Sequence, residues 1–149
     1  MKKLTSILLL SLSLFGCLFH IAELPDIVSA NVYDDIESKA KELEQNDTLS
    51  TIYSVDNYVE RTTIYQFNYQ PVPFFRFWRT RVGDCTDKAN LKRKMLHYLN
   101  ISTRSVYGIV HNGEGWGKHD WYEFNINGTY QDIESEMFYG LKKLGSGRW

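Results

Sequence analysis

The chain has 149 residues, a length that suits one domain. Hydrophobic residues make up 43% of it and charged residues 23%, an ordinary globular composition. The formal net charge is -1, so we expect no nucleic-acid partner and no electrostatic binding to an anionic membrane surface.

The first 30 residues follow the order of a signal peptide. Lys2-Lys3 forms a basic end, the run from Ile7 to Phe19 forms an apolar centre, and Val28-Ser29-Ala30 offers small residues for cleavage. Cleavage at that point would leave residues 31–149 as a single domain.

Two other fates of this segment stay open. Leu14-Phe15-Gly16-Cys17 resembles a bacterial lipobox, in which Cys17 would carry a lipid anchor. The apolar run could instead remain as a membrane anchor, although it is short for a span of about 20 residues. All three fates place the domain outside the cytoplasm, either secreted or attached to the outer face of the cell membrane. We expect membrane contact only through this segment.

Helical spacing of apolar residues appears twice at the start of the domain. It predicts a helix over 34–45 and a second helix, capped by Thr48 or Ser50, that carries Ile52, Val55 and Val59. Two prolines in 70–73 interrupt regular structure. The aromatic cluster that follows, residues 74–78, is either core or one wall of a substrate groove.

A third helix is predicted over residues 86–99. Leu91, Met95 and Leu99 fall on one apolar stripe. The basic residues of this helix are expected to form its solvated side: Lys88, Lys92, Arg93 and Lys94.

Strands are predicted over 103–110, 118–126 and 129–133, because these segments are rich in β-branched and aromatic residues. Asn127-Gly128 is a strong signal for a two-residue hairpin turn between the last two strands. The segment 135–144 is predicted to be a final helix.

Cys85 is the only cysteine that remains if the N-terminal segment is removed. It precedes a predicted helix, and a helix N-terminus stabilises a thiolate. His119 lies on a predicted strand and supplies a base, and an acidic residue follows across the hairpin. This order of cysteine, histidine and carboxylate is typical of an acyl-transfer site of the cysteine-protease kind.

Two carboxylates compete for the third position. With a two-residue turn, Trp121 faces Glu134, which becomes a diagonal neighbour of His119 within reach of a long side chain. Asp132 lies one step further along the same face and would approach His119 only if a bulge shifted the register. Glu134 is preferred, and both stay candidates.

Three motifs resemble those of the transglutaminase-like superfamily, over residues 52–134. They are Gly83-Asp84-Cys85-Thr86-Asp87-Lys88-Ala89, Leu99-Asn100-Ile101-Ser102-Thr103-Arg104, and His119-Asp120-Trp121-Tyr122-Glu123-Phe124 followed by Asn127-Gly128. The resemblance implies an α+β, papain-like core in which the nucleophile helix packs on a small antiparallel sheet. It also implies a Cys-His-Asp triad; the position where the family usually has its aspartate is Glu134 here. Family members include peptidases, amidases, transglutaminases, archaeal cell-wall endoisopeptidases and inactive relatives.

We therefore expect an exported, monomeric, cysteine-dependent enzyme that acts on amide bonds of a protein or peptide, including a cell-wall peptide. No cofactor is expected, and no close pair of cysteines or histidines favours zinc. The backbone N–H of Cys85 would form half of an oxyanion hole, with Gln66, Gln70 or Trp78 as the other donor. The alternative is a non-catalytic module on the same fold that binds a peptide or a cell-envelope ligand.

Overall fold

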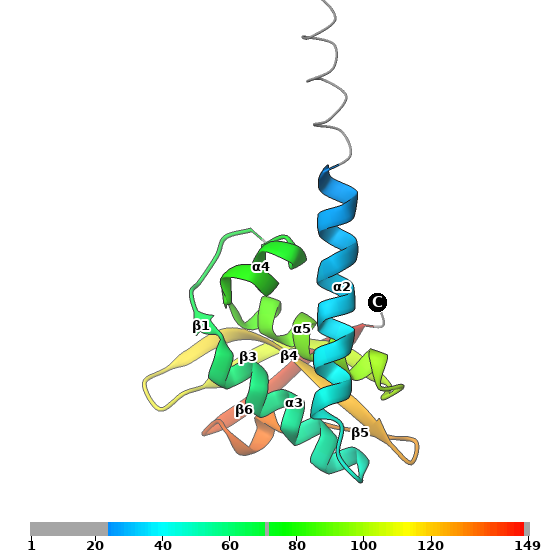
Figure 1. Ribbon diagram of the computed structural model, residues 1–149. Helices are drawn as coiled ribbons and strands as arrows, with labels where there is room; N and C mark the ends of the chain where they lie inside the picture. Colours follow the sequence, from blue (N-terminus) through cyan, green and yellow to red (C-terminus); the bar gives the residue numbers. More distant parts are fainter. Residues whose placement is uncertain (1–23, 71, 148–149) are drawn as a thin grey trace, which may run out of the picture. The chain divides into compact units, whose positions relative to one another are not determined.

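The computed structural model describes residues 24–70 and 72–147 (Figure 1). The chain divides into two compact units, residues 1–34 and 35–149. The basic end and apolar run of the predicted signal peptide, with Cys17, lie outside the described residues, whereas the predicted cleavage point falls within α2 (Leu24–Leu43). Within the described ranges no helix has the length and apolarity needed to cross a membrane.

The larger unit begins within α2, whose C-terminal part belongs to it. The next helix is α3 (Thr48–Thr62). The side chain of Asp47 accepts a hydrogen bond from the Ser50 N–H at 2.8 Å, so Asp47 is the N-cap and the predicted caps are wrong by one position or more. The predicted apolar face of α3 is confirmed, because its three aliphatic residues are buried: Ile52, Val55 and Val59.

The aromatic cluster at 74–78 lies in a short helix, α4 (Phe74–Thr80), that begins directly after Pro73. Phe77 is fully buried, while Phe75 is 47% exposed. The helix packs against α5 (Cys85–Tyr98), so the cluster contributes to the core through Phe77.

Two short parallel strands, β1 (Ile64–Tyr65) and β2 (Val82–Gly83), stand just before α5. Their register pairs Tyr65 with Gly83. This pairing brings a segment from well upstream in the sequence beside the start of the helix that carries Cys85.

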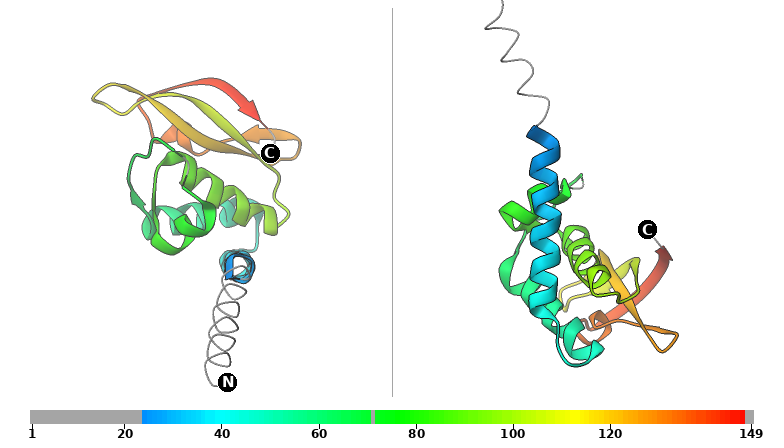
Figure 2. Two further views of the ribbon diagram at one scale, coloured as in Figure 1. Left: turned by 90° about the horizontal axis from the view of Figure 1, so that it is seen from above. Right: turned by 45° about the vertical axis from the view of Figure 1, so that its right-hand side comes forward.

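The remaining strands form one antiparallel sheet in the order β5-β4-β3-β6. Its members are β3 (Thr103–His111), β4 (Trp116–Ile126), β5 (Thr129–Gln131) and β6 (Gly140–Gly147). Figure 2 shows these strands as a layer beside α5, which packs on β3 and β4. The prediction of an α+β fold with a helix on a small antiparallel sheet is confirmed.

The predicted final helix is wrong. A single 3-10 turn, η1 (Glu134–Glu136), is followed by β6, which pairs with β3 and completes the sheet. Glycines at 140, 145 and 147 disfavour a helix there. Gly145 is also required for packing, because a Cβ atom at this position would collide with the ring and hydroxyl of Tyr107.

Candidate active site

Cys85 is the first residue of α5, one position earlier than the predicted helix start. Asp84 caps the helix by accepting hydrogen bonds from the Thr86 and Asp87 N–H groups at 3.0 and 3.3 Å, and Asp87 accepts one in return from the Asp84 N–H at 3.1 Å. Gly83 makes room for this capping box, since a Cβ there would lie 2.5 Å from Asp87 Oδ2. The thiol is thus held at the first turn, where the helix dipole favours a thiolate.

His119 lies on β4 with its ring held on two sides. Trp121 stacks on it with ring centroids 5.9 Å apart and an interplanar angle of 15°, and Phe138 contacts it edge-on at 5.1 Å. The imidazole lines the same pocket as the Cys85 side chain, and its Nε2 lies 3.3 Å from Glu134 Oε2. With Nε2 directed at the carboxylate, Nδ1 is the ring nitrogen that remains for the thiol.

Opposing effects set the pKa of His119. Burial lowers the pKa, but hydrogen bonds to Cys85 and Glu134 and the negative charge of both groups outweigh burial and raise it from 6.5 to about 9. The ring is therefore protonated at neutral pH. A protonated imidazole beside a thiol at a helix N-terminus is the arrangement that stabilises a thiolate–imidazolium pair.

The structure brings Glu134, and not Asp132, to His119. The hairpin register is as predicted, with Ile126 opposite Thr129, but β5 ends at Gln131. Glu134 then reaches the imidazole from the 3-10 turn η1 rather than as a diagonal neighbour on a strand. Asp132 Oδ1 accepts a hydrogen bond from the Ser135 N–H at 2.7 Å, so this carboxylate stabilises the turn that presents Glu134.

A direct hydrogen bond ties the helix to the sheet beside the two reactive groups. The Thr86 hydroxyl donates to Asp120 Oδ2 at 2.6 Å. Thr86 follows Cys85 and Asp120 follows His119 in the chain. The bond therefore links the start of α5, which carries Cys85, to the strand β4, which carries His119.

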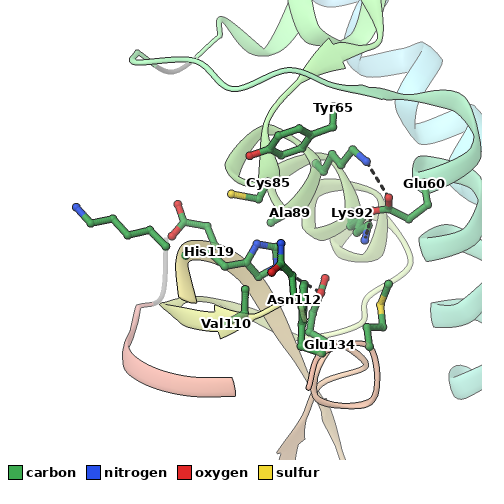
Figure 3. A pocket seen from close by; sticks show the side chains of 15 residues that line it. Glu60, Tyr65, Cys85, Ala89, Lys92, Val110, Asn112, His119 and Glu134 are labelled. Atoms are coloured by element: carbon green, nitrogen blue, oxygen red, sulfur yellow. Dashed lines mark hydrogen bonds and ion pairs between the residues drawn. The ribbon is translucent and has the colours of Figure 1, made fainter. Parts of the chain in front are cut away.

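Cys85, His119 and Glu134 line one pocket of about 430 Å³. Figure 3 shows Tyr65 on the wall of this pocket, with its hydroxyl on the same side as the Cys85 sulfur. Burial, followed by the charge of Cys85, raises the pKa of Tyr65, so this hydroxyl stays protonated and can donate a hydrogen bond. No sequence pattern identifies Tyr65 as a residue of this pocket, since the parallel pairing of β1 and β2 that places it is not visible in the sequence.

The three predicted oxyanion donors do not line this pocket. Gln66 and Gln70 line a separate pocket. The ring of Trp78 is covered by the guanidinium of Arg81, 3.5 Å from its centroid. None of the three predicted donors therefore lies in the pocket that contains Cys85.

Lys92 was expected in solvent but is only 3% exposed. Its Nζ lies 2.6 Å from Asp56 Oδ1 and 2.9 Å from Glu60 Oε1, both on α3. Burial lowers the pKa of Lys92, but the attraction of these carboxylates outweighs it and raises the pKa. Glu60 also pairs with Lys88 at 2.8 Å. The charges on this wall of the Cys85 pocket are therefore paired with one another.

The two other residues of the strand motif have supporting contacts. Trp121 is buried against His119, and Glu123 lies between Arg104 and Lys143 with contacts of 2.5 and 2.6 Å. In residues 24–70 and 72–147, no group of three or more histidine, cysteine, aspartate and glutamate side chains is arranged to hold a metal ion.

A cysteine on a helix N-terminus facing a strand-borne histidine defines a site of the papain-like cysteine-enzyme type. Residues 34–135 match the model of the Transglutaminase-like superfamily, which is more than half of the chain, and the protein belongs to this superfamily. No curated protein matches the sequence.

Two solved structures are similar in fold. One is of a candidate cysteine protease from Cytophaga hutchinsonii, with 19% identity and a TM-score of 0.66, over 77% of this chain and 42% of that one. The other is of a TGase, with 12% identity and a TM-score of 0.54, over 78% of this chain and 35% of that one. The chain thus spans less than half the length of either neighbour.

Proposed function

We propose that the protein is an exported cysteine-dependent enzyme that breaks or exchanges amide bonds, with Cys85 as nucleophile, His119 as acid and base, and Glu134 as the group that orients the histidine. The observation that carries the proposal is the position of His119, which shares one pocket with Cys85 and lies 3.3 Å from Glu134. The N-terminal sequence pattern supports export, and a protein or peptide is the substrate class that this chemistry serves.

The reaction would proceed by acyl transfer. The Cys85 thiolate attacks the carbonyl carbon of the amide, and the oxyanion that forms accepts hydrogen bonds from the Cys85 backbone N–H and the Tyr65 hydroxyl. His119 donates its proton to the departing amine as the C–N bond breaks, which leaves a thioester on Cys85. His119 then removes a proton from an incoming water or amine, whose oxygen or nitrogen attacks the thioester carbonyl. The C–S bond breaks, Cys85 leaves as a thiolate, and the acyl group is released as a carboxylic acid or a new amide.

Alkylation of the wild-type protein tests the proposal. The full chain is treated with iodoacetamide, the fraction modified at Cys85 is measured by mass spectrometry, and turnover is followed on casein, peptidoglycan and pseudomurein. We expect turnover of at least one substrate to fall in proportion to the alkylated fraction of Cys85. Turnover by fully alkylated protein would contradict the assigned nucleophile. A binding module would be favoured if no substrate were turned over and iodoacetamide alkylated Cys85 no faster in the folded protein than in the unfolded protein.

The third residue is tested by a matched pair of substitutions. Glu134→Gln removes the charge that holds the imidazole, so we expect kcat to fall by about 10⁴-fold, as when an amide replaces a triad acid. Asp132→Asn removes an equal charge two residues away, where the carboxylate only caps a turn, and should lower kcat by less than about ten-fold. Steady-state kinetics measure both, and an effect of Asp132→Asn as large as that of Glu134→Gln would overturn the assignment.

A further inference from the structure

A second pocket of about 540 Å³ lies between α5 and the sheet, with walls from α5, β3, β4 and β6. It shares Ala89 and Asp120 with the pocket that contains Cys85. The two pockets are therefore neighbours, separated by residues that belong to both.

Trp121 presents an unsatisfied donor in this second pocket. Its side chain is 1% exposed, and its indole Nε1 has no hydrogen-bond acceptor among the described residues. A buried N–H without an acceptor destabilises a fold, and such groups are rare in proteins. The same indole ring stacks on His119, so this pocket borders the residue that lines the Cys85 pocket.

Arg93 supplies a second donor from α5. Its Nε is buried and likewise lacks an acceptor in the described part of the chain, and burial lowers the pKa of its guanidinium with no acidic group to offset the effect. Arginine is the side chain best suited to bind a carboxylate through two parallel hydrogen bonds. Arg93 lines this pocket and also a neighbouring one, so two residues with unsatisfied donors border the same cavity. Such a pair points to a ligand that carries acceptor oxygens.

Arg93 and Asp120, the acidic residue of this pocket, lie toward different ends of it. Arg93 follows Thr86 by two helical turns, so both lie on one face, about 10 Å apart along the axis. Asp120 is held by the hydroxyl of Thr86. Along the helix, the pocket therefore has Arg93 toward one end and Asp120 toward the end nearest Cys85, and no acidic group raises the pKa of Arg93.

We propose that this pocket is a subsite for the free carboxylate of a peptide substrate, bound by the Arg93 guanidinium and the Trp121 indole N–H. The proposal rests on the proposed function, because it assumes that the amide to be cleaved lies at Cys85. Arg93 is about 12 Å beyond Cys85 along the helix, a distance that about three to four extended residues cover. The substrate would then end about three residues after the cleaved bond.

Binding to the inactive full-length Cys85→Ala protein tests this subsite without requiring turnover. N-acetyl-trialanine with a free carboxylate is compared with the same peptide carrying a terminal amide. The readout is the NMR signal of the Trp121 indole N–H, which is assigned with a Trp121→Phe variant. We expect the acid to bind at least about ten-fold more tightly than the amide and to shift this signal.

The control is a second loss of positive charge on the same helix. Arg93→Gln should abolish the preference for the acid, whereas Lys94→Gln, whose residue does not line this pocket, should preserve it. Equal binding of the two peptides, no binding of either at about 10 mM, or an equal effect of both substitutions would overturn the subsite. Since no step of the test needs catalysis, such a result would leave the role of Cys85 to be judged from the alkylation experiment alone.

Discussion

Replacing Cys85 with alanine is expected to lower kcat/KM by about 10⁶-fold, because removal of the nucleophile of a cooperating triad costs nearly as much as removal of the whole triad. The substitution deletes one sulfur atom from a side chain that is not fully buried, so the fold should survive. Turnover of the best substrate from the panel measures the loss. Cys17→Ala is the matched control, since it removes the other cysteine of the chain and should leave kcat/KM unchanged.

The Cys85→Ala protein has a second readout that does not depend on a substrate. Loss of the hydrogen bond and of the negative charge beside the imidazole should lower the pKa of His119 from its value of about 9. An NMR titration of the ring protons follows this change. An unchanged titration would show that the thiol and the imidazole do not interact, and the proposed pair would then be wrong.

Replacing His119 with glutamine should also lower kcat/KM by about 10⁶-fold, because the thiolate then lacks both its counter-ion and its proton donor. The Cys85→Ala/His119→Gln double variant should be no slower than either single variant, since the two residues act as a unit. A double variant that is a further 10³-fold slower or more would show that the two residues contribute independently.

His119→Gln should also change how stability depends on pH. The folded-state pKa of about 9 exceeds the ordinary value of 6.5, so folding favours the protonated ring. The resulting stabilisation of the wild type, about 3 kcal/mol, is fully present below pH 6.5 and is lost as pH rises through about 9. Urea unfolding at several pH values should show that glutamine removes this dependence and is most costly at acidic pH. A wild-type profile that does not decline toward pH 9 would contradict the shift.

The sequence predicted those parts of the fold that depend on neighbouring residues. The helix that follows Cys85, the apolar stripe through Leu91 and Met95, and the Asn127-Gly128 turn are local signals, and each appears in the structure. The same turn determines the strand register that favoured Glu134 over Asp132 as the partner of His119. In the structure Glu134 contacts His119 from the 3-10 turn η1 and not from a strand.

The features that the sequence missed depend on distant partners. The sequence predicts that Lys92 is exposed to solvent. In the structure it is buried because α3 places Asp56 and Glu60 beside it. Residues 140–147 have too little intrinsic strand propensity for a strand to be predicted from the sequence. They form a strand by pairing with the edge of β3. Tyr65 enters the Cys85 pocket through its pairing with Gly83, a contact between segments that no periodicity reveals. The catalytic roles of Cys85, His119 and Glu134 stay predictions.

The order of these elements along the chain has a consequence for biosynthesis. The thiol and the imidazole have both been synthesised by residue 119, but the carboxylate comes fifteen residues later, in a turn that connects to the edge strand β6. In the proposed mechanism, a polypeptide that is still emerging from the ribosome would therefore have its nucleophile and its base without the group that orients the base. The proposed site would therefore be complete only once the turn at residues 134–136 and β6 have folded onto the rest of the domain.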